Sequence, residues 1–139
     1  MVRKVLGTTQ TVSSLLNKVN AARRSAGLRP LCLNAKLMAA AQAHANDQAA
    51  KRRMSHTGSD GSQVWNRVQR RGYKWTFIAE NVAYGYPNVD AVFKGWMNSP
   101  GHRANILSRK AQHMGAGFNS RGNYWAQVFG ASSSSGCSS

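Results

Sequence analysis

The stretch WMNSPGHRANIL, residues 96–107, contains a pattern typical of the start of a short helix, and a histidine lies in the first turn of that helix. Ser99 is a good N-cap residue, and Pro100 suits the first position of a helix, because its missing N–H would have no partner there anyway. The helical turn that follows carries His102 and Ile106. We therefore expect a short helix that carries one histidine.

Helices dominate the chain before this stretch. Apolar residues recur at helical spacing, and residues that favour helix ends flank the periodic segments. The patterns predict four helices: one with the apolar stripe Val12, Leu15, Leu16 and Val19, ending by Gly27; a second from the N-cap Asn34 to about Arg53; a short third from about Gln63 to Arg71; and a fourth capped by Asn88.

Two predicted strands follow the last of these helices. Apolar residues alternate from Met114 to Phe118, and Tyr124–Phe129 is rich in aromatic and β-branched residues. The short segment 119–123 between them indicates a β-hairpin. Ile78–Tyr84 can supply a third strand. Helices on both faces of a small antiparallel sheet would bury both of its sides, so we predict an α+β protein with an α-β-α sandwich.

Several bulky and small residues are expected to form the core. Trp96, Trp125 and Phe129 are predicted to be buried between the sheet and its helices. Gly115 and Gly117 lie in a predicted strand, where a missing side chain lets a helix approach closely. We expect this pair to mark a tight helix–sheet contact.

Positive charge greatly exceeds negative charge. Lys and Arg total 19 against 4 for Asp and Glu, a formal net charge of +15. Such a field attracts polyanions. The basic residues are scattered over several predicted helices, and no known nucleic-acid motif organises them, so nucleic acid is an unlikely partner. An anionic membrane or cell-wall polymer fits better, and a solvated surface with no single ligand is the simpler alternative.

The length of 139 residues fits one folded unit with two short ends. We divide it into an N-terminal extension (1–10), a domain (11–130) and a flexible Ser-rich tail (131–139). Cys32 and Cys137 are the two cysteines, and no CxxC pair exists. In an oxidising compartment they could form one disulfide that ties the tail to the body. The sequence leaves open whether they come close enough.

Glu80 is the only glutamate, and it lies in the apolar-flanked run Ile78–Ala83. A carboxylate in a half-buried segment needs partners, because an unpaired buried charge is costly. It lies in sequence between His56 and His102. Two histidines and a carboxylate are a common ligand set for a divalent metal.

These motifs, in their order and spacing, resemble the CAP superfamily, the cysteine-rich secretory, antigen 5 and pathogenesis-related 1 type of domain. The resemblance covers roughly Ser14 to Phe129 and is most like the bacterial and fungal branch. It rests on these segments: Leu16–Asn20 with Arg23, Leu31–Leu37, Met54–His56, Ala79–Ala83, Trp96–Leu107, Gly115–Gly117 and Tyr124–Phe129.

The resemblance implies an α-β-α sandwich, secretion, and a cleft with two histidines and up to two acidic residues. The matching positions are His56, His102 and Glu80. The second acid would lie shortly before the second histidine, where Met97–Ser99 holds no carboxylate. The resemblance also implies weak binding of Zn²⁺ or another divalent cation, and the missing acid should weaken it further. Several branches of the family bind sterols or fatty acids.

Two interpretations of the cleft remain open. In one, His56 and His102 bind a metal, and Glu80 either joins them or orients a histidine. In the other, the three side chains form a buried network that locks loops to the sheet. His113 is the reserve ligand if His102 points away from the cleft, and His44 is expected to be a partly exposed or packed histidine rather than a ligand.

Two classes of function follow. The first is a secreted binding protein for a lipid, a sterol or an anionic surface, and it has no catalytic residue. The second is a metal-dependent hydrolase of peptide or polysaccharide with Glu80 as its base. We favour the binding protein, because catalysis is not a general property of the family that the chain resembles and because one acid is missing.

Overall fold

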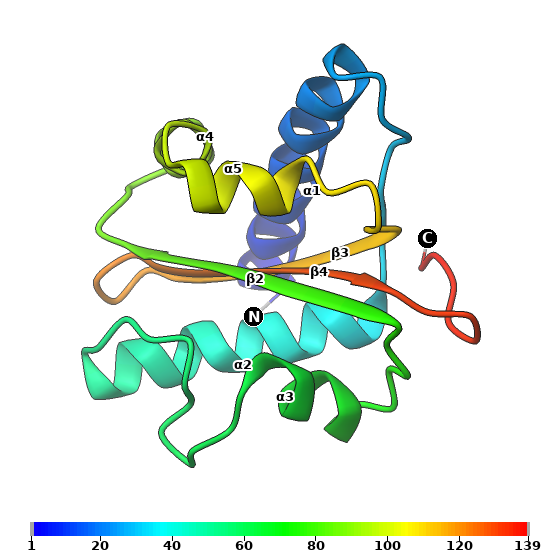
Figure 1. The fold of residues 1–139 in the computed structure, drawn as a ribbon. Helices are drawn as coiled ribbons and strands as arrows, with labels where there is room; N and C mark the ends of the chain where they lie inside the picture. The colour runs from blue at the N-terminus through cyan, green and yellow to red at the C-terminus, as the bar shows by residue number, and fades with distance from the viewer. Residues whose placement is uncertain (1, 139) are drawn as a thin grey trace.

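Residues 2–138, which the computed structural model describes, form one four-stranded sheet between two layers of helices (Figure 1). The strands are β1 (Cys32–Leu33), β2 (Phe77–Tyr84), β3 (His113–Asn119) and β4 (Tyr124–Ala131). Their order across the sheet is β1-β3-β4-β2. β3 and β4 form the predicted hairpin, and β2 pairs antiparallel with β4. The short β1 pairs parallel with β3, which makes the sheet mixed and leaves β1 and β2 as its edges.

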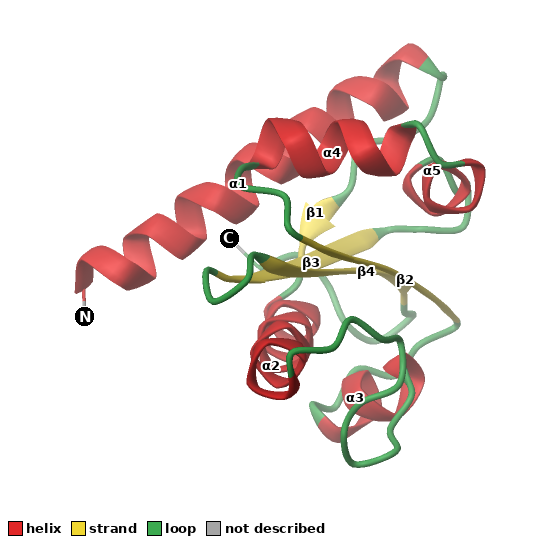
Figure 2. Ribbon diagram, turned by 90° about the vertical axis from the view of Figure 1, so that its left-hand side faces the viewer, coloured by secondary structure: helices red, strands yellow, loops and turns green. Residues whose placement is uncertain are grey.

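Helices cover both faces of the sheet, which confirms the α-β-α sandwich (Figure 2). One face carries α1 (Val2–Ser25), α4 (Val89–Met97) and α5 (Pro100–Ile106), and the other carries α2 (Ala35–Lys51) and α3 (Val64–Arg70). In the part of the chain that the structure describes, no helix combines the length and apolarity needed to cross a membrane.

The helices begin and end where short-range chemistry places them. The side chain of Asn34 accepts hydrogen bonds from the backbone N–H groups of Lys36 and Leu37, at 2.9 and 3.1 Å, as an N-cap residue does. Arg52 ends α2 in the left-handed conformation, with φ of 52°. The side chain of Asn88 caps α4 in the same way as Asn34 caps α2. Three of the predicted helix boundaries thus lie within about two residues of the observed ones, as is usual for such assignments.

Each face of the sheet has its own apolar core. Trp96, Trp125 and Phe129 are almost fully buried in the core beneath α1, α4 and α5, as predicted. On the other face, α2 lies directly against β3. A Cβ atom at Gly115 would collide with the backbone of Leu37, and one at Gly117 with the backbone of Gln42. The two glycines therefore allow the close helix–sheet contact that the sequence predicted.

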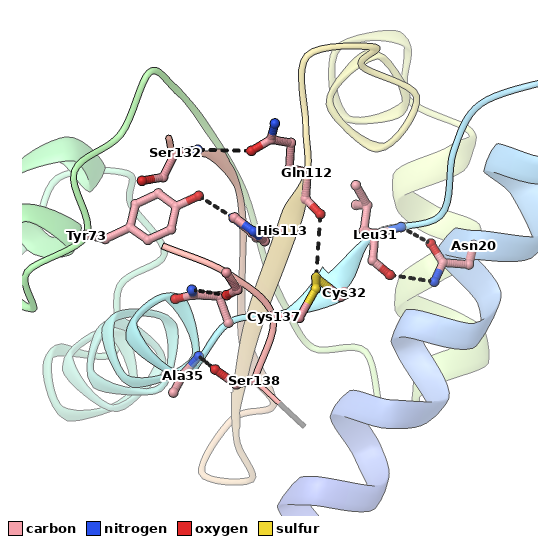
Figure 3. The surroundings of a disulfide bond; sticks show 12 residues. Asn20, Leu31, Cys32, Ala35, Tyr73, Gln112, His113, Ser132, Cys137 and Ser138 are labelled. Carbon is pink, nitrogen blue, oxygen red and sulfur yellow. Dashed lines mark hydrogen bonds between the residues drawn. A yellow bond between two sulfur atoms is a disulfide. The ribbon is translucent and has the colours of Figure 1, made fainter. Parts of the chain in front are cut away.

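The C-terminal segment is fastened beside β1. Cys32 and Cys137 form a disulfide, with Cα atoms 5.5 Å apart. Next to it, the Ser138 hydroxyl accepts a hydrogen bond of 2.8 Å from the backbone N–H of Ala35, the first residue of α2 (Figure 3). The tail that the sequence suggested to be flexible therefore makes defined contacts with the body. The limits of the extension, domain and tail stay a prediction.

Candidate functional site

The candidate site is built on β2, a strand at the edge of the sheet. Successive side chains of a strand point to opposite faces. Glu80 points to the face covered by α2 and α3, where it meets Arg67 of α3. Asn81 points to the other face, where it meets α5 through the backbone carbonyl of His102. α3 and α5 thus bracket the same edge from below and above (Figure 1).

Glu80 is buried and uses both of its carboxylate oxygens. Only 2% of its side chain is exposed. Oε1 lies 3.0 Å from Nδ1 of His56, and Oε2 accepts a hydrogen bond of 2.8 Å from Nη2 of Arg67. A buried carboxylate with a cation and a second hydrogen-bond donor avoids the cost of an unpaired charge. The expectation that Glu80 has partners is confirmed.

Arg67 is a member of the site that the sequence interpretation missed, because it treated this residue as part of a scattered basic surface. The side chain is 9% exposed. Its guanidinium also donates to the backbone carbonyls of His56 and Ser62, at 3.0 and 2.8 Å. Arg67 therefore fixes the loop before α3 to the strand that carries Glu80. The signal that could have found it is the need of a lone buried carboxylate for a cation.

A set of amides holds the opposite face of the same strand. Asn105 donates to the Asn81 side chain at 2.9 Å and to the backbone carbonyl of Glu80 at 3.2 Å. Asn81 donates to Gln127 of β4 at 3.1 Å. Asn81 and Gln127 are fully buried, so these bonds satisfy polar groups that have no access to water. They attach α5, and with it His102, to the sheet.

Ser99 performs a different task from the one predicted. It occupies the N-cap position of α5, but its side chain makes no capping hydrogen bond. Its hydroxyl instead lies 2.8 Å from Nδ1 of His102. Nδ1 of each cleft histidine, in His56 and His102, is thus held by a partner. No residue in 2–138 forms a hydrogen bond with Nε2 of either ring.

The pKa values of the two histidines are shifted in opposite directions. The hydrogen bond that the His56 ring donates to the Glu80 carboxylate raises the pKa of His56 above its usual value, against the effect of partial burial. Burial lowers the pKa of His102, and the charge of His56 lowers it further. His56 lies in the loop before α3, whereas His102 lies in α5, which covers the other face of the sheet.

The donor set does not form a closed structural metal site. Within residues 2–138, no three or more His, Cys, Asp or Glu side chains are grouped so that they could hold a metal ion. The Glu80 oxygens already bind His56 and Arg67, which leaves Nε2 of His56 and Nε2 of His102 as ligands. A carboxylate behind a histidine orients the ring and increases its basicity. Metal binding by this pair stays a prediction.

The other two histidines lie in the packed structure. Nδ1 of His113 is 2.7 Å from the hydroxyl of Tyr73, beside the disulfide (Figure 3). His44 is buried in α2, and its Nε2 is 2.6 Å from the backbone carbonyl of Ser55. Burial lowers the pKa of both imidazoles. His113 is thus already engaged as the partner of a buried phenol.

The family can be assigned once this geometry is known. The sequence model described as "CAP: Cysteine-rich secretory protein family" matches residues 16–130. The chain belongs to the CAP family. The resemblance first noted in the motifs around His56, Glu80 and His102 is thereby confirmed.

Two proteins of Bacillus subtilis (strain 168) are similar to this CAP chain in sequence. One is named Uncharacterized protein YkwD and is 34% identical over 110 residues, which cover 79% of this chain and 43% of that protein. The other, Uncharacterized membrane protein YlbC, is 27% identical over 121 residues, or 87% of this chain and 34% of that protein. This CAP chain thus spans less than half the length of either relative.

Solved structures share the CAP fold. An extracellular protein of Bacillus anthracis str. Ames that contains an SCP domain superposes with a TM-score of 0.83 at 24% identity, covering 88% of this chain and 40% of that one. An outer surface protein of Borrelia burgdorferi gives a TM-score of 0.80 at 20% identity, covering 86% of this chain and 91% of that one. At these identities the likeness establishes the fold alone.

Proposed function

We propose that this CAP domain is an extracellular binding module, not an enzyme. The observation that carries the proposal is the state of Glu80. Both of its oxygens are engaged, by His56 and Arg67, and its side chain is almost fully buried. A general base must reach the proton that it removes. Glu80 instead supports the site from behind, as a residue that orients His56.

An extracellular location is supported by two independent features. The Cys32–Cys137 disulfide suits an oxidising compartment. The Bacillus anthracis protein that shares the fold is described as extracellular. A net charge of +15 would then face the anionic polymers and lipids outside a cell.

We further propose that the cleft binds Zn²⁺ or a similar divalent cation weakly through Nε2 of His56 and His102. Neutral imidazole is a good ligand for Zn²⁺, and water would complete the shell. Bound metal would supply a positive centre for an oxygen atom of a ligand. Two protein ligands and no added carboxylate favour weak binding, because nothing in the shell offsets the metal's charge.

Histidine NMR signals provide the test of metal binding. We expect Zn²⁺ to shift the ring signals of His56 and His102 together and saturably. The signals of His113 and His44, both buried and bonded elsewhere, serve as internal controls. His56→Ala and His102→Ala should each abolish the saturable change. Equal shifts at all four histidines, or unchanged binding in both variants, would contradict the proposal.

We propose that the partner recognised through surface charge is an anionic membrane or wall polymer. Three consecutive basic residues, Lys51, Arg52 and Arg53, are all exposed at the end of α2. Polyanion binding should be strong at low salt and weak at high salt, because added ions screen exposed charges. Sterols and fatty acids, which other branches of the family bind, are further candidate ligands.

Co-sedimentation separates these partners. We expect binding to vesicles that contain phosphatidylglycerol and to isolated anionic wall polymer, no binding to phosphatidylcholine vesicles, and release at high salt. The pair K51E and R53E should weaken binding, whereas the charge-conserving pair K51R and R53K should not. Saturable binding of labelled sterol or fatty acid that ignores salt would favour an apolar ligand instead.

Activity assays test the non-enzymatic part of the proposal. On a panel of peptides and polysaccharides with Zn²⁺ present, the wild type and Glu80→Gln should show the same background rate. A rate in the wild type that disappears in both Glu80→Gln and His102→Ala would establish the hydrolase instead.

A further inference from the structure

A cavity lies on the face of the sheet that α2 and α3 cover. Its volume is about 230 Å³, and its walls come from α2, the end of α3 and the loop between these helices. His44 and Asp47 line it from α2, and Arg70 and Arg71 from the end of α3. The cleft residues His56, Glu80 and His102 are not among its walls. The cavity therefore adjoins the candidate site through Arg67, but its walls do not include the two cleft histidines or Glu80.

His44, one of the lining residues, has an unpaired hydrogen-bond acceptor. Its Nε2 is 2.6 Å from the carbonyl oxygen of Ser55. A carbonyl can only accept, so Nε2 carries the hydrogen. Burial lowers the pKa of His44, which keeps the ring neutral and leaves Nδ1 with a bare lone pair. Less than 1 Å² of the surface of Nδ1 is accessible to solvent, and no described residue forms a hydrogen bond with it. A buried acceptor without a donor is costly, so this position lacks one donor.

Most of the other polar groups around the cavity already have partners. Arg67, which also lines it, holds Glu80, and Arg70 donates to Asp60 at 2.7 Å. Asp47 accepts hydrogen bonds from the backbone and hydroxyl of Ser59, at 2.8 and 2.5 Å. The guanidinium of Arg71 has no such partner within residues 2–138 and is exposed. Among the lining residues, His44 thus has a buried acceptor without a donor, and Arg71 has a guanidinium without an ion pair.

We propose that this cavity binds a small hydroxylated molecule the size of a single sugar ring, with one hydroxyl donating to Nδ1 of His44 and another accepting from Arg71. A hydroxyl group can both donate and accept, which matches the two unused groups. The volume is below the roughly 300–1,000 Å³ of sites for drug-sized ligands, so one ring is the suitable size.

Other classes of ligand fit the cavity less well. An apolar molecule would cover polar groups without replacing their hydrogen bonds, which costs free energy. A multiply charged anion would lie beside the carboxylates of Asp47 and Asp60, which also line the cavity. Because Nδ1 of His44 is almost sealed, a bound hydroxyl would reach it only after a small shift of the ring or of the covering loop.

The test follows the His44 ring by NMR while glucose, N-acetylglucosamine and glucuronate are each titrated. We expect at least one of them to shift the Nδ1 signal of His44 saturably, with a dissociation constant on the order of 1 mM. His113, which lies against Tyr73 away from the cavity, should not move. Zn²⁺ is left out, so the result is independent of whether the cleft binds metal.

Two matched variants on α2 decide whether the cavity itself is responsible. Ala43 is exposed and lines the cavity, so Ala43→Leu fills it without disturbing a buried position. Ala50 is equally exposed on the same helix but is not a lining residue. We expect at least a tenfold loss of affinity in Ala43→Leu and none in Ala50→Leu. No saturable shift with any of the three sugars, or equal affinity in the two variants, would overturn the proposal.

Discussion

The two edges of the sheet are closed by different chemistry. At one edge, the two-residue β1 lies beside a C-terminal segment that a disulfide attaches covalently. At the other, the eight-residue β2 is covered by hydrogen bonds and an ion pair centred on Glu80 and Asn81. An exposed strand edge invites pairing with other chains unless it is covered. The disulfide at the β1 edge has no group that titrates. The network at the β2 edge contains His56, whose charge depends on pH and whose Nε2 has no partner among the described residues.

The largest expected effect comes from breaking the ion pair at the β2 edge. Arg67→Met would leave the buried carboxylate of Glu80 without its cation, which typically costs about 3–5 kcal/mol of unfolding free energy. Urea denaturation measures this loss. Arg70→Met removes an exposed partner of Asp60 and should change stability little. Equal losses in the two variants would mean that the Glu80 pair contributes no more than a surface contact.

Removing the disulfide at the β1 edge should have the next largest effect on stability. The disulfide joins residues 105 positions apart, and bridges over long segments typically contribute about 2–4 kcal/mol. We expect C32S/C137S to lose this amount in urea denaturation, and reduction of the wild type to do the same. The pKa of His56 should stay unchanged. A shift in that pKa would show that the two edges are coupled.

The amides at the β2 edge should contribute less than the ion pair. Asn105→Ala leaves the Asn81 side chain and the Glu80 carbonyl without a donor, and an unpaired buried acceptor costs about 1–3 kcal/mol. Asn98 is exposed at the end of α4, and Asn98→Ala is the matched control. Thermal unfolding compares the two. If Asn105→Ala is no less stable than the control, water replaces its hydrogen bonds.

The smallest effect is the response of the β2 edge to pH. His56 has a raised pKa in the folded protein, so its contribution to stability is complete below its unfolded pKa near 6.5. That contribution is lost as the pH rises through the higher folded value. NMR titration should show the His56 pKa above 6.5 in the wild type and lower in Glu80→Gln.

His102 should respond in the opposite direction, because its pKa is lowered. Its neutral ring suits the fold at pH values above about 6.5, and stability declines as the pH falls below that value. A His102 pKa at or above 6.5 would contradict the partial burial of its ring, which is the main cause of the lowered value. The disulfide at the β1 edge has no titratable group, so it contributes to neither of these two pH responses.

The sequence predicted those features that depend on residues close together in the chain. Asn34 and Asn88 cap helices because a side-chain oxygen within a few residues reaches free N–H groups. The hairpin of β3 and β4 followed from alternation and a short turn. The family motifs also marked His56, Glu80 and His102. Whether these three bind metal is still a prediction.

Other features depend on contacts that no local pattern encodes. Ser99 had the sequence context of an N-cap, yet its hydroxyl lies against His102, because the same oxygen can serve either partner. Tyr73 is fully buried because it packs against His113, 40 residues further along the chain. Arg67 looked like one basic residue among nineteen.

The sequence by itself determined the helices, the hairpin, the α-β-α layering and the family, because capping, periodicity and ordered motifs act over short stretches of chain. Only the tertiary structure decided which cation neutralises Glu80, that Cys32 meets Cys137, and that an imidazole nitrogen of His44 is left without a donor. The physical reason is that hydrogen bonds, ion pairs and disulfides depend on distances of a few ångströms between residues far apart in the chain, and folding alone sets those distances.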